Sequence, residues 1–366
     1  MSEEWFATHA AGFGPLAARL AGRDLPGSAV RADGDNALRI SLPGGPSGGR
    51  PPLVLLSYCR ALFRLLGEEP GGLADAARSF ARSGAGQGFE RQGGAGSPRP
   101  GGGRGAYARR SGGTFVLRSF GPDDPAPIPS EARREIEGLI ARAAGMRPDS
   151  ARPDREYRLQ ERSDGRVLFL ERIAAGRGEP GPRRGELPRT TCRLLAEMTE
   201  PGPEDVFLDP FCGYGGIALE RVLAAPYRFV FASDTDAEKI AELKRELGTK
   251  AFEKRRRTFF PKVRDALEGS ALEAGFVTAI ATDPPWGLYE GGVRDKAGAE
   301  SLLEAFVAEA TRLLAPGGRL VLLVAREMAD PPLCEAAAPG DAFVLRERLD
   351  VLVSGKKASV LKMSRS

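Results

Sequence analysis

The stretch DPFCGYGG, residues 209–216, decides how the second half of the chain folds. It follows the apolar run VFL and precedes a segment from Ile217 to Ala225 that has the apolar spacing of a helix, so it is a strand-to-helix turn. Small residues in such a turn let backbone N–H groups approach a ligand at the helix N-terminus. The turn lacks the G-x-G-x-x-G pattern of NAD sites, which argues against NAD as the ligand. The chain also contains no G-x-x-x-x-G-K-[ST], so the sequence does not support a binding site for a nucleoside triphosphate.

Strand and helix patterns alternate on both sides of this turn, from Leu187 onward. Apolar strand runs and amphipathic helix runs follow one another as RFVFASD (228–234), DAEKIAELKREL (236–247), TFFPKVRDA (258–266), VTAIATD (277–283), ESLLEAFVAEATRLL (300–314) and RLVLLVA (319–325). This order predicts a doubly wound α/β domain with a mostly parallel, seven-stranded sheet. The last two strand runs, residues 343–355 and 356–363, have no helix between them and predict a C-terminal antiparallel hairpin.

Four successive strands of this half end in an acid: Asp209, Asp234, Asp265 and Asp283. In such sheets the carboxyl ends of the strands form the edge that binds ligands, and an acid at the position of Asp234 accepts hydrogen bonds from ribose hydroxyls. Any one of these acids could instead be the N-cap of the next helix. Four in succession favour a ligand that is cationic and rich in hydroxyl groups.

The stretch ATDPPWG, residues 281–287, carries the chemistry of the predicted site. A residue before proline is held extended, so both Asp283 and Pro284 are fixed, and proline offers a carbonyl without an N–H. The turn therefore presents two hydrogen-bond acceptors beside the indole of Trp286. Two acceptors can hold the two hydrogens of an exocyclic amine while the indole stacks on its base, which favours attack by the amine lone pair. The alternative is a rigid loop around a buried tryptophan.

The pattern of the first half, residues 1–172, predicts an α+β region, which could divide into two small units. Strands are expected in residues 4–10, 36–42 and 112–121, helices in 12–25, 53–66, 74–82 and 130–145, and a hairpin in 156–173. Residues 83–113 are rich in Gly and Arg and predict a flexible insert, either a spacer or a segment that binds RNA. Residues 173–186 are the expected linker.

Composition narrows the class of protein. The chain has a net charge of +4, four scattered cysteines and one histidine, which favours a cytoplasmic protein without a metal site or histidine-based catalysis. No apolar run is long enough for a membrane span. The KRRR run at 254–257 is interpreted as a solvated helix end rather than a phosphate-binding patch.

Together these motifs resemble the Rossmann-fold, S-adenosylmethionine-dependent methyltransferases that act on exocyclic amino groups. GELPRTTCRLLAEM (185–198) resembles the motif before the first strand, DPFCGYGG motif I, and DPPWG the catalytic D/N-P-P-aromatic motif. The subgroup most similar methylates N2 of guanosine in tRNA or rRNA and carries an N-terminal THUMP domain. Residues 350–363 resemble the tail of that subgroup, 114–173 the later part of a THUMP domain, and 1–41 the ferredoxin-like unit before it.

The resemblance implies a role for each motif residue. The cofactor loop would consist of Asp209, Phe211, Cys212, Gly213, Tyr214 and Gly215, with Asp234 on the ribose, Asp265 and Ala266 on the adenine, and Pro188 and Thr190 closing the pocket. Asp283 and Pro284 would hold the target amine next to the cofactor. Pro285 is the next residue of the catalytic motif, and Trp286 would stack on the base. Tyr214 and Trp286 depart from the small residue and the Tyr or Phe that are usual in the family.

The leading hypothesis is an RNA guanine-N2 methyltransferase that uses S-adenosylmethionine and grips structured RNA, most readily tRNA, with residues 1–172. One alternative is methylation of adenine N6 in DNA or RNA, because D-P-P-W does not distinguish one aromatic amine from another. The other is an inert RNA-binding scaffold. The methyltransferase domain is expected over residues 187–366.

Overall fold

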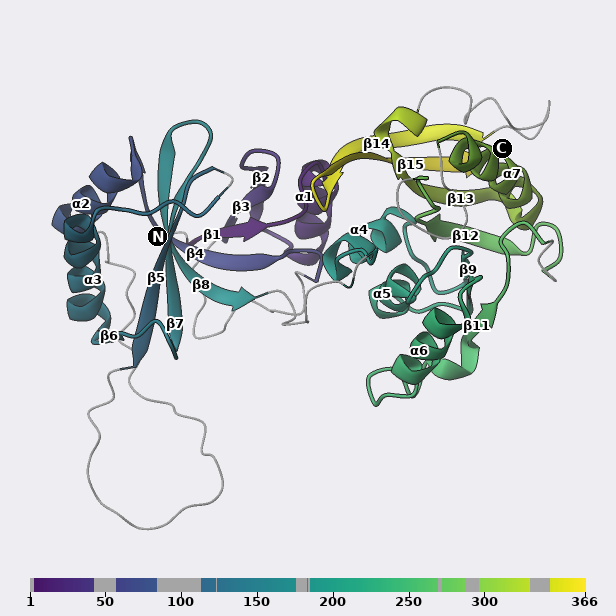
Figure 1. The fold of residues 1–366 in the computed structure, drawn as a ribbon, viewed down its shortest axis with the longest axis horizontal. Coiled ribbons are helices and arrows are strands. Elements are labelled where there is room, and N and C mark those ends of the chain that lie inside the picture. The colour runs from purple at the N-terminus through teal and green to yellow at the C-terminus, as the bar shows by residue number, and fades with distance from the viewer. Residues whose placement is uncertain are drawn as a thin grey trace, which may run out of the picture.

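The computed structural model describes residues 3–42, 57–83, 113–122, 124–175, 183, 185–268, 272–287, 296–329 and 343–366. Most of the Gly/Arg-rich insert (83–113) and of the linker (173–186) lies outside the described residues, as does Cys334. The strands form two sheets, one in each half of the chain, which Figure 1 shows side by side.

The sheet of the second half has seven strands in the order β11-β10-β9-β12-β13-β15-β14. Their bounds are β9 (Val206–Asp209), β10 (Phe229–Asp234), β11 (Phe259–Val263), β12 (Val277–Thr282), β13 (Leu314–Ala325), β14 (Phe343–Val353) and β15 (Lys356–Arg365). The strands from β9 to β13 pair in parallel, and β15 pairs antiparallel with both β13 and β14. The predicted mostly parallel sheet with a closing antiparallel hairpin is therefore confirmed.

Helices cover both faces of this sheet, which explains why β9 is buried along its whole length and β12 along nearly all of it. Phe207 packs in the same core as the helices α4 (Arg189–Met198), α5 (Gly216–Ala224) and α6 (Ala237–Leu247). Its neighbour Leu208 packs instead with α7 (Lys296–Leu313) in a second core. Because adjacent strand residues point to opposite faces, these two cores fix the strand register and hold the carboxyl ends of the strands at one edge.

The sheet of the first half is continuous, with eight strands in the order β2-β3-β1-β4-β8-β7-β5-β6. Their bounds are β1 (Glu3–Thr8), β2 (Ala29–Ala32), β3 (Ala37–Leu42), β4 (Ala61–Pro70), β5 (Thr114–Phe120), β6 (Arg147–Pro148), β7 (Arg155–Glu161) and β8 (Arg166–Ala175), and the helices are α1 (Gly14–Asp24), α2 (Leu73–Ser83) and α3 (Ser130–Ala144). The pairing of β4 with β8 joins what the sequence suggested were separate small units. Among the described residues, no helix combines the length and the apolar character needed to cross a membrane.

The helix predicted for residues 53–66 is wrong for its described part, because residues 57–60 form a turn and β4 begins at Ala61, while residues 53–56 lie outside the described residues. The run ALFRLL suits either structure by its apolar residues, and pairing decides, because β4 hydrogen-bonds to β1 on one side and to β8 on the other. The pairing places Phe63 in the core and Arg64 beside the buried carboxylate of Glu171. Strand β2 was missed because its short sequence is largely exposed and shows no alternation.

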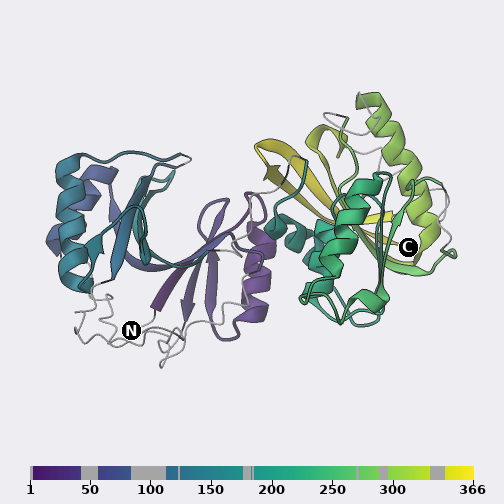
Figure 2. The same ribbon diagram turned by 60° about the horizontal axis from the view of Figure 1, so that its bottom comes forward.

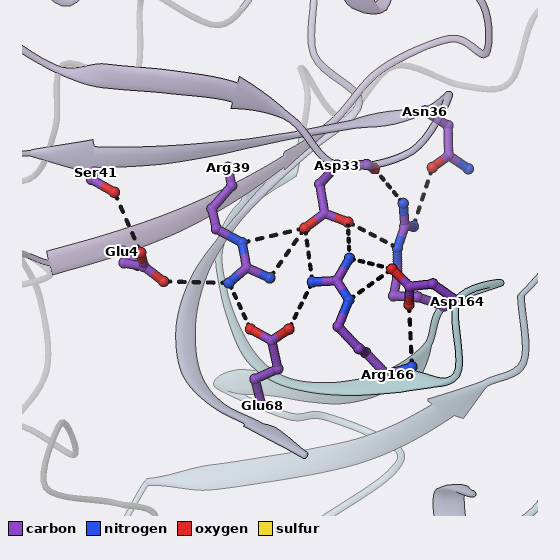
Figure 3. Close-up of polar contacts among 9 residues, drawn as sticks. Glu4, Asp33, Asn36, Arg39, Ser41, Glu68, Asp164 and Arg166 are labelled. Atoms are coloured by element: carbon purple, nitrogen blue, oxygen red, sulfur yellow. Dashed lines mark hydrogen bonds and ion pairs between the residues drawn. The ribbon is translucent and has the colours of Figure 1, made fainter. Parts of the chain in front are cut away.

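A ring of charged side chains ties the two parts of this sheet together (Figure 3). Arg39 on β3 contacts Asp33 at 3.1 Å and Glu68 at 2.6 Å. Arg166 on β8 contacts the same two acids at 3.1 and 2.6 Å, so each carboxylate bridges both arginines. Because the Asp33 and Arg39 side chains are only 4 and 5% exposed, this ring fixes the loop after β2 against β4 and β8.

Helix α1 packs against the second half of the chain, next to α4 and β14 (Figures 1 and 2). The amide of Leu352 on β14 donates a 3.2 Å hydrogen bond to the carbonyl of Ala11. Arg23 at the end of α1 contacts Glu197 on α4 at 2.8 Å, and the Glu197 side chain is 1% exposed. The beginning of the chain is thus part of the packing of the second half.

Candidate active site

The four predicted acids lie along one edge of the seven-stranded sheet. β9 ends at Asp209 and β10 at Asp234, while Asp265 and Asp283 follow the ends of β11 and β12. These four strands are neighbours and run parallel, so their carboxyl ends meet at the same edge. The structure therefore brings together the acids that the sequence placed at four separate strand ends.

The loop between β9 and α5 depends on two glycines in left-handed backbone conformations. Gly213 has φ 53° and Gly215 has φ 85° and is the N-cap of α5. A Cβ atom on Gly215 would lie 2.4 Å from a methyl carbon of Leu243, so a larger residue does not fit there. The absence of a side chain at Gly215 therefore lets the start of α5 pack closely against α6.

Asp234 connects this loop to the next one. Its Oδ2 accepts a 2.9 Å hydrogen bond from the Gly213 amide, and its Oδ1 accepts one of 2.9 Å from the amide of Asp236. Asp236 in turn caps α6 by accepting from the amides of Glu238 and Lys239. The two backbone donors hold the Asp234 carboxylate in place, and its remaining lone pairs are available to hydroxyl groups of a ligand.

The D-P-P-W turn contains a hydrogen bond that the sequence did not predict. The Trp286 indole Nε1 donates to Asp283 Oδ1 at 2.9 Å, so the ring is held against the carboxylate. Trp286 is partly exposed and packs on the cores of both sheet faces. Burial of the carboxyl raises the pKa of Asp283 to about 7, although the bond from Trp286 opposes the shift.

Asp209 stands behind the loop. It is completely buried, and its Oδ1 accepts a 2.7 Å hydrogen bond from the hydroxyl of Thr282. Its Oδ2 has no hydrogen-bond partner among the described residues. Burial, with the nearby charges of Asp234 and Asp283, raises its pKa to about 8 against the hydrogen bond from Thr282. Sequence reasoning missed Thr282, because a threonine at a strand end is ordinary for a strand.

Exposure divides the predicted site residues into two groups. The partly exposed residues, which a ligand can touch, are Pro188, Thr190, Phe211, Gly213, Tyr214, Asp234, Asp265, Ala266, Asp283, Pro285 and Trp286. The residues that are buried as a whole are Asp209, Cys212, Pro284 and Gly215. The surface available to a ligand is therefore made by the loops, with the strand ends beneath it.

Tyr214 occupies its unusual position between two cations. The guanidinium of Arg183 lies 4.5 Å from the centre of the Tyr214 ring, and Lys239 Nζ lies 5.9 Å from it. These contacts account for an aromatic residue in a loop that otherwise requires small ones.

The basic run at 254–257 lies away from the candidate site. It precedes β11, whereas Asp265 follows the same strand, so the run belongs to the opposite edge of the sheet. Arg255, Arg256 and Arg257 are exposed there, which agrees with a solvated turn. Among the described residues, no group of three or more His, Cys, Asp or Glu side chains is arranged to hold a metal ion.

Comparison with known proteins gives matches for both halves of the chain. A tRNA (guanine(6)-N2)-methyltransferase of Thermus thermophilus is 30% identical over 230 residues, which cover 59% of this chain and 62% of that protein. A tRNA (guanine(10)-N2)-dimethyltransferase of Methanothermobacter thermautotrophicus is 24% identical over 267 residues, which cover 70% of this chain and 74% of that one. The chain thus aligns with less than two thirds of the length of the Thermus protein.

The fold is shared with a solved structure over its whole length. The crystal structure of TrmN from Thermus thermophilus superimposes with a TM-score of 0.73 and covers 100% of both chains at 22% identity. Residues 182–337 match the family model described as RMKL-like, methyltransferase domain. That segment contains the cofactor-loop motif, three further strand-end acids and the D-P-P-W turn. Residues 182–337 are therefore similar to the RMKL-like methyltransferase domain family.

Proposed function

We propose that the protein is an S-adenosylmethionine-dependent RNA methyltransferase that modifies the exocyclic N2 amine of a guanosine in tRNA. The observation that carries the proposal is the row of four acids beside a D-P-P-W turn at one sheet edge. The two tRNA guanine-N2 methyltransferases that resemble this chain support the choice of base and of RNA.

The residues at the edge suit this cofactor. Its sulfonium and ammonium groups are cationic, and the edge provides carboxylates, of which Asp209 has a buried oxygen without a hydrogen-bond partner among the described residues. In the proposal, Asp234 accepts from the ribose hydroxyls, Asp265 from the adenine amine, and Gly213 and Tyr214 line the methionine portion. When bound, the cofactor supplies a methyl group that is already activated by the sulfonium.

Asp283 and the Pro284 carbonyl are proposed to hold the two hydrogens of the target amine. Because Trp286 occupies Asp283 Oδ1, the Oδ2 atom is the one left for the amine. The amine lone pair forms the new N–C bond as the S–C bond breaks and its electron pair stays on sulfur. The amine proton then passes to Asp283, whose pKa of about 7 suits it to accept a proton near neutral pH.

The first half, residues 1–172, is proposed to bind the RNA and to consist of a ferredoxin-like unit followed by a THUMP-like unit. The linker is proposed at residues 173–186 and the catalytic domain over residues 187–366. Structured RNA presents shape and unstacked bases to such a separate module. We further propose that the protein acts in the cytoplasm, where the buried thiols of Cys59, Cys192 and Cys212 stay reduced.

Label transfer from isotope-labelled S-adenosylmethionine to tRNA tests the function, followed by mass spectrometry of the nucleosides. N2-methylguanosine is the expected product. N6-methyladenosine would replace the proposal by the adenine alternative. RNA binding without transfer to any RNA, by protein that binds the cofactor, would favour the inert scaffold.

A further inference from the structure

Thr282, the last residue of β12, connects the two loops of the candidate site from inside the protein. Its side chain is completely buried, and its hydroxyl makes two hydrogen bonds. The amide of Phe211, in the loop after β9, donates to Thr282 Oγ1 at 3.3 Å. The second bond joins Thr282 Oγ1 to Asp209 Oδ1 at 2.7 Å. Asp283, which begins the D-P-P-W turn, is the next residue in the chain.

When Asp209 is ionised, the chemistry of the two partners fixes the direction of both hydrogen bonds. An amide N–H can only donate, so the hydroxyl oxygen must accept from Phe211. The single hydroxyl proton is then free to point only at Asp209, whose Oδ1 accepts it. A hydrogen bond donated to a carboxyl group favours its ionised form. Thr282 therefore acts on the charge of Asp209 as well as on its position.

Charged and titratable groups approach Asp209 from several elements. Asp234 comes from β10, Asp283 from the turn after β12, Cys212 from the loop after β9, and Cys192 from α4. The two carboxylates disfavour a negative charge on Asp209, and burial disfavours it further. Among these contacts, the hydroxyl of Thr282 and the Phe211 amide are the groups that favour the charge.

We propose that Thr282 is a positioning residue for cofactor binding, which favours the ionised form of Asp209 behind the loop when the cationic cofactor arrives and ties that loop to the turn carrying Asp283. The inference rests on the proposed function, since it requires a cationic ligand at this edge. An ionised Asp209 attracts the sulfonium and ammonium through the thin layer of loop in front of it, where solvent screening is weak. Cofactor affinity should consequently increase with pH as Asp209 loses its proton.

The same strand provides a matched control. Thr278, near the start of β12, accepts from the Val206 amide at 3.0 Å and donates to Asp205 Oδ1 at 3.2 Å. This arrangement repeats that of Thr282 at the opposite edge of the sheet. Thr278→Val removes an equivalent pair of hydrogen bonds without touching the candidate site.

The test is calorimetric titration with S-adenosylmethionine between pH 6 and 9, on full-length protein carrying Asp283→Asn so that Asp283 does not titrate. In this background we compare the protein that has no further substitution with four variants, Thr282→Val, Thr282→Ser, Thr278→Val and Asp209→Asn. Thr282→Val should move the midpoint of the affinity profile upward by about one pH unit, as expected for losing a hydrogen bond to a charged group. Thr282→Ser and Thr278→Val should keep the original midpoint, and Asp209→Asn should remove the rise in affinity that accompanies loss of the Asp209 proton.

The outcomes separate the inference from the proposed function. A Thr282→Val protein that binds more weakly by the same factor at every pH would overturn the inference, because a merely structural role predicts that result. A pH profile that is unchanged in Asp209→Asn would overturn it as well, and this variant keeps the test decisive if Thr282→Val fails to fold. Absence of cofactor binding by the unsubstituted protein at every pH would instead overturn the proposed function.

Discussion

At the residue scale, Asp283 carries the proposed chemistry and also the clearest dependence on pH. Asp283→Asn keeps the size of the side chain but cannot accept the amine proton, so methyl transfer to tRNA should fall by a factor of about 10² to 10⁴. Cofactor affinity should change by less than about threefold, since the residue acts on the amine. Label transfer and calorimetry measure the two quantities.

The pH profile of methyl transfer gives the sign of the Asp283 contribution. Only the carboxylate accepts a proton, and its pKa is about 7, so the rate should rise with pH through neutrality and level off above it. The residual rate of Asp283→Asn should lack this rise. The exposed Glu204 provides a control, and Glu204→Gln should behave like the unsubstituted protein. Full turnover by Asp283→Asn would exclude Asp283 as the proton acceptor.

For Asp209 we predict an effect of pH on stability, opposite in sign to the effect of pH on the rate. Its pKa rises from 3.8 to about 8 on folding, so between these values the folded protein binds more protons than the unfolded chain. The free energy of unfolding should therefore decrease as pH rises from about 4 to 8. Asp209→Asn has no carboxyl group to titrate, so its free energy of unfolding should not show this decrease. Between pH 5 and 8 the variant should therefore gain on the order of 2 kcal/mol of unfolding free energy relative to the unsubstituted protein. Denaturant unfolding at both pH values measures the difference, and parallel pH curves for the two proteins would contradict it.

At the scale of elements, the loop between β9 and α5 depends on Gly215 more than on Gly213. Gly215→Ala combines φ 85° with a Cβ atom 2.4 Å from Leu243, so it should cost about 2–4 kcal/mol and weaken cofactor binding. Gly213→Ala has φ 53° but nothing within 4 Å of the new atom, so it should cost only about 1–2 kcal/mol. Equal losses of unfolding free energy in the two variants would show that the contact with Leu243 is unimportant.

The elements of the second half could be predicted from the sequence because each carries its own pattern. The run VFL, the glycine turn and the helix from Gly216 are recognisable locally, and four strand-end acids need only the parallel order to meet. Strand β4 was predicted as helix because its partners β1 and β8 are distant in sequence. The hydrogen bonds of Thr282 to Asp209 and of Trp286 to Asp283 were not predictable, since they depend on side-chain directions that no spacing encodes.

At the scale of the whole molecule, the two halves share a core. Phe13, Leu16 and Leu20 of the α1 region pack with Met198 of α4 and Val351 of β14. Across the same contact, Glu197 on α4 pairs with Arg193 at 2.9 Å and with Arg23 of α1 at 2.8 Å. Removing residues 1–172 would therefore expose apolar side chains of the second half, so loss of RNA binding by such a fragment would not isolate an RNA-binding role. A substitution that loosens this contact in the full chain is the sharper experiment.

Gly12 offers that substitution. It has φ 87°, and a Cβ atom there would lie 2.1 Å from the carbonyl oxygen of Asp350 on β14, so Gly12→Ala must push the two halves apart locally. The nearest reporter is the Leu352 amide, which donates to the Ala11 carbonyl and should exchange its hydrogen at least about tenfold faster in the variant. Gly27→Ala has a similar φ of 84° with nothing within 4 Å, so it reproduces the backbone strain without the collision. Hydrogen exchange at the Leu352 amide should be unchanged in Gly27→Ala. Methylation of tRNA should fall only in Gly12→Ala, because in that variant the proposed RNA-binding half would lose its fixed distance from Asp283. Normal tRNA methylation by a Gly12→Ala protein with fast exchange at Leu352 would mean that the α1 contact stabilises the second half without positioning the RNA.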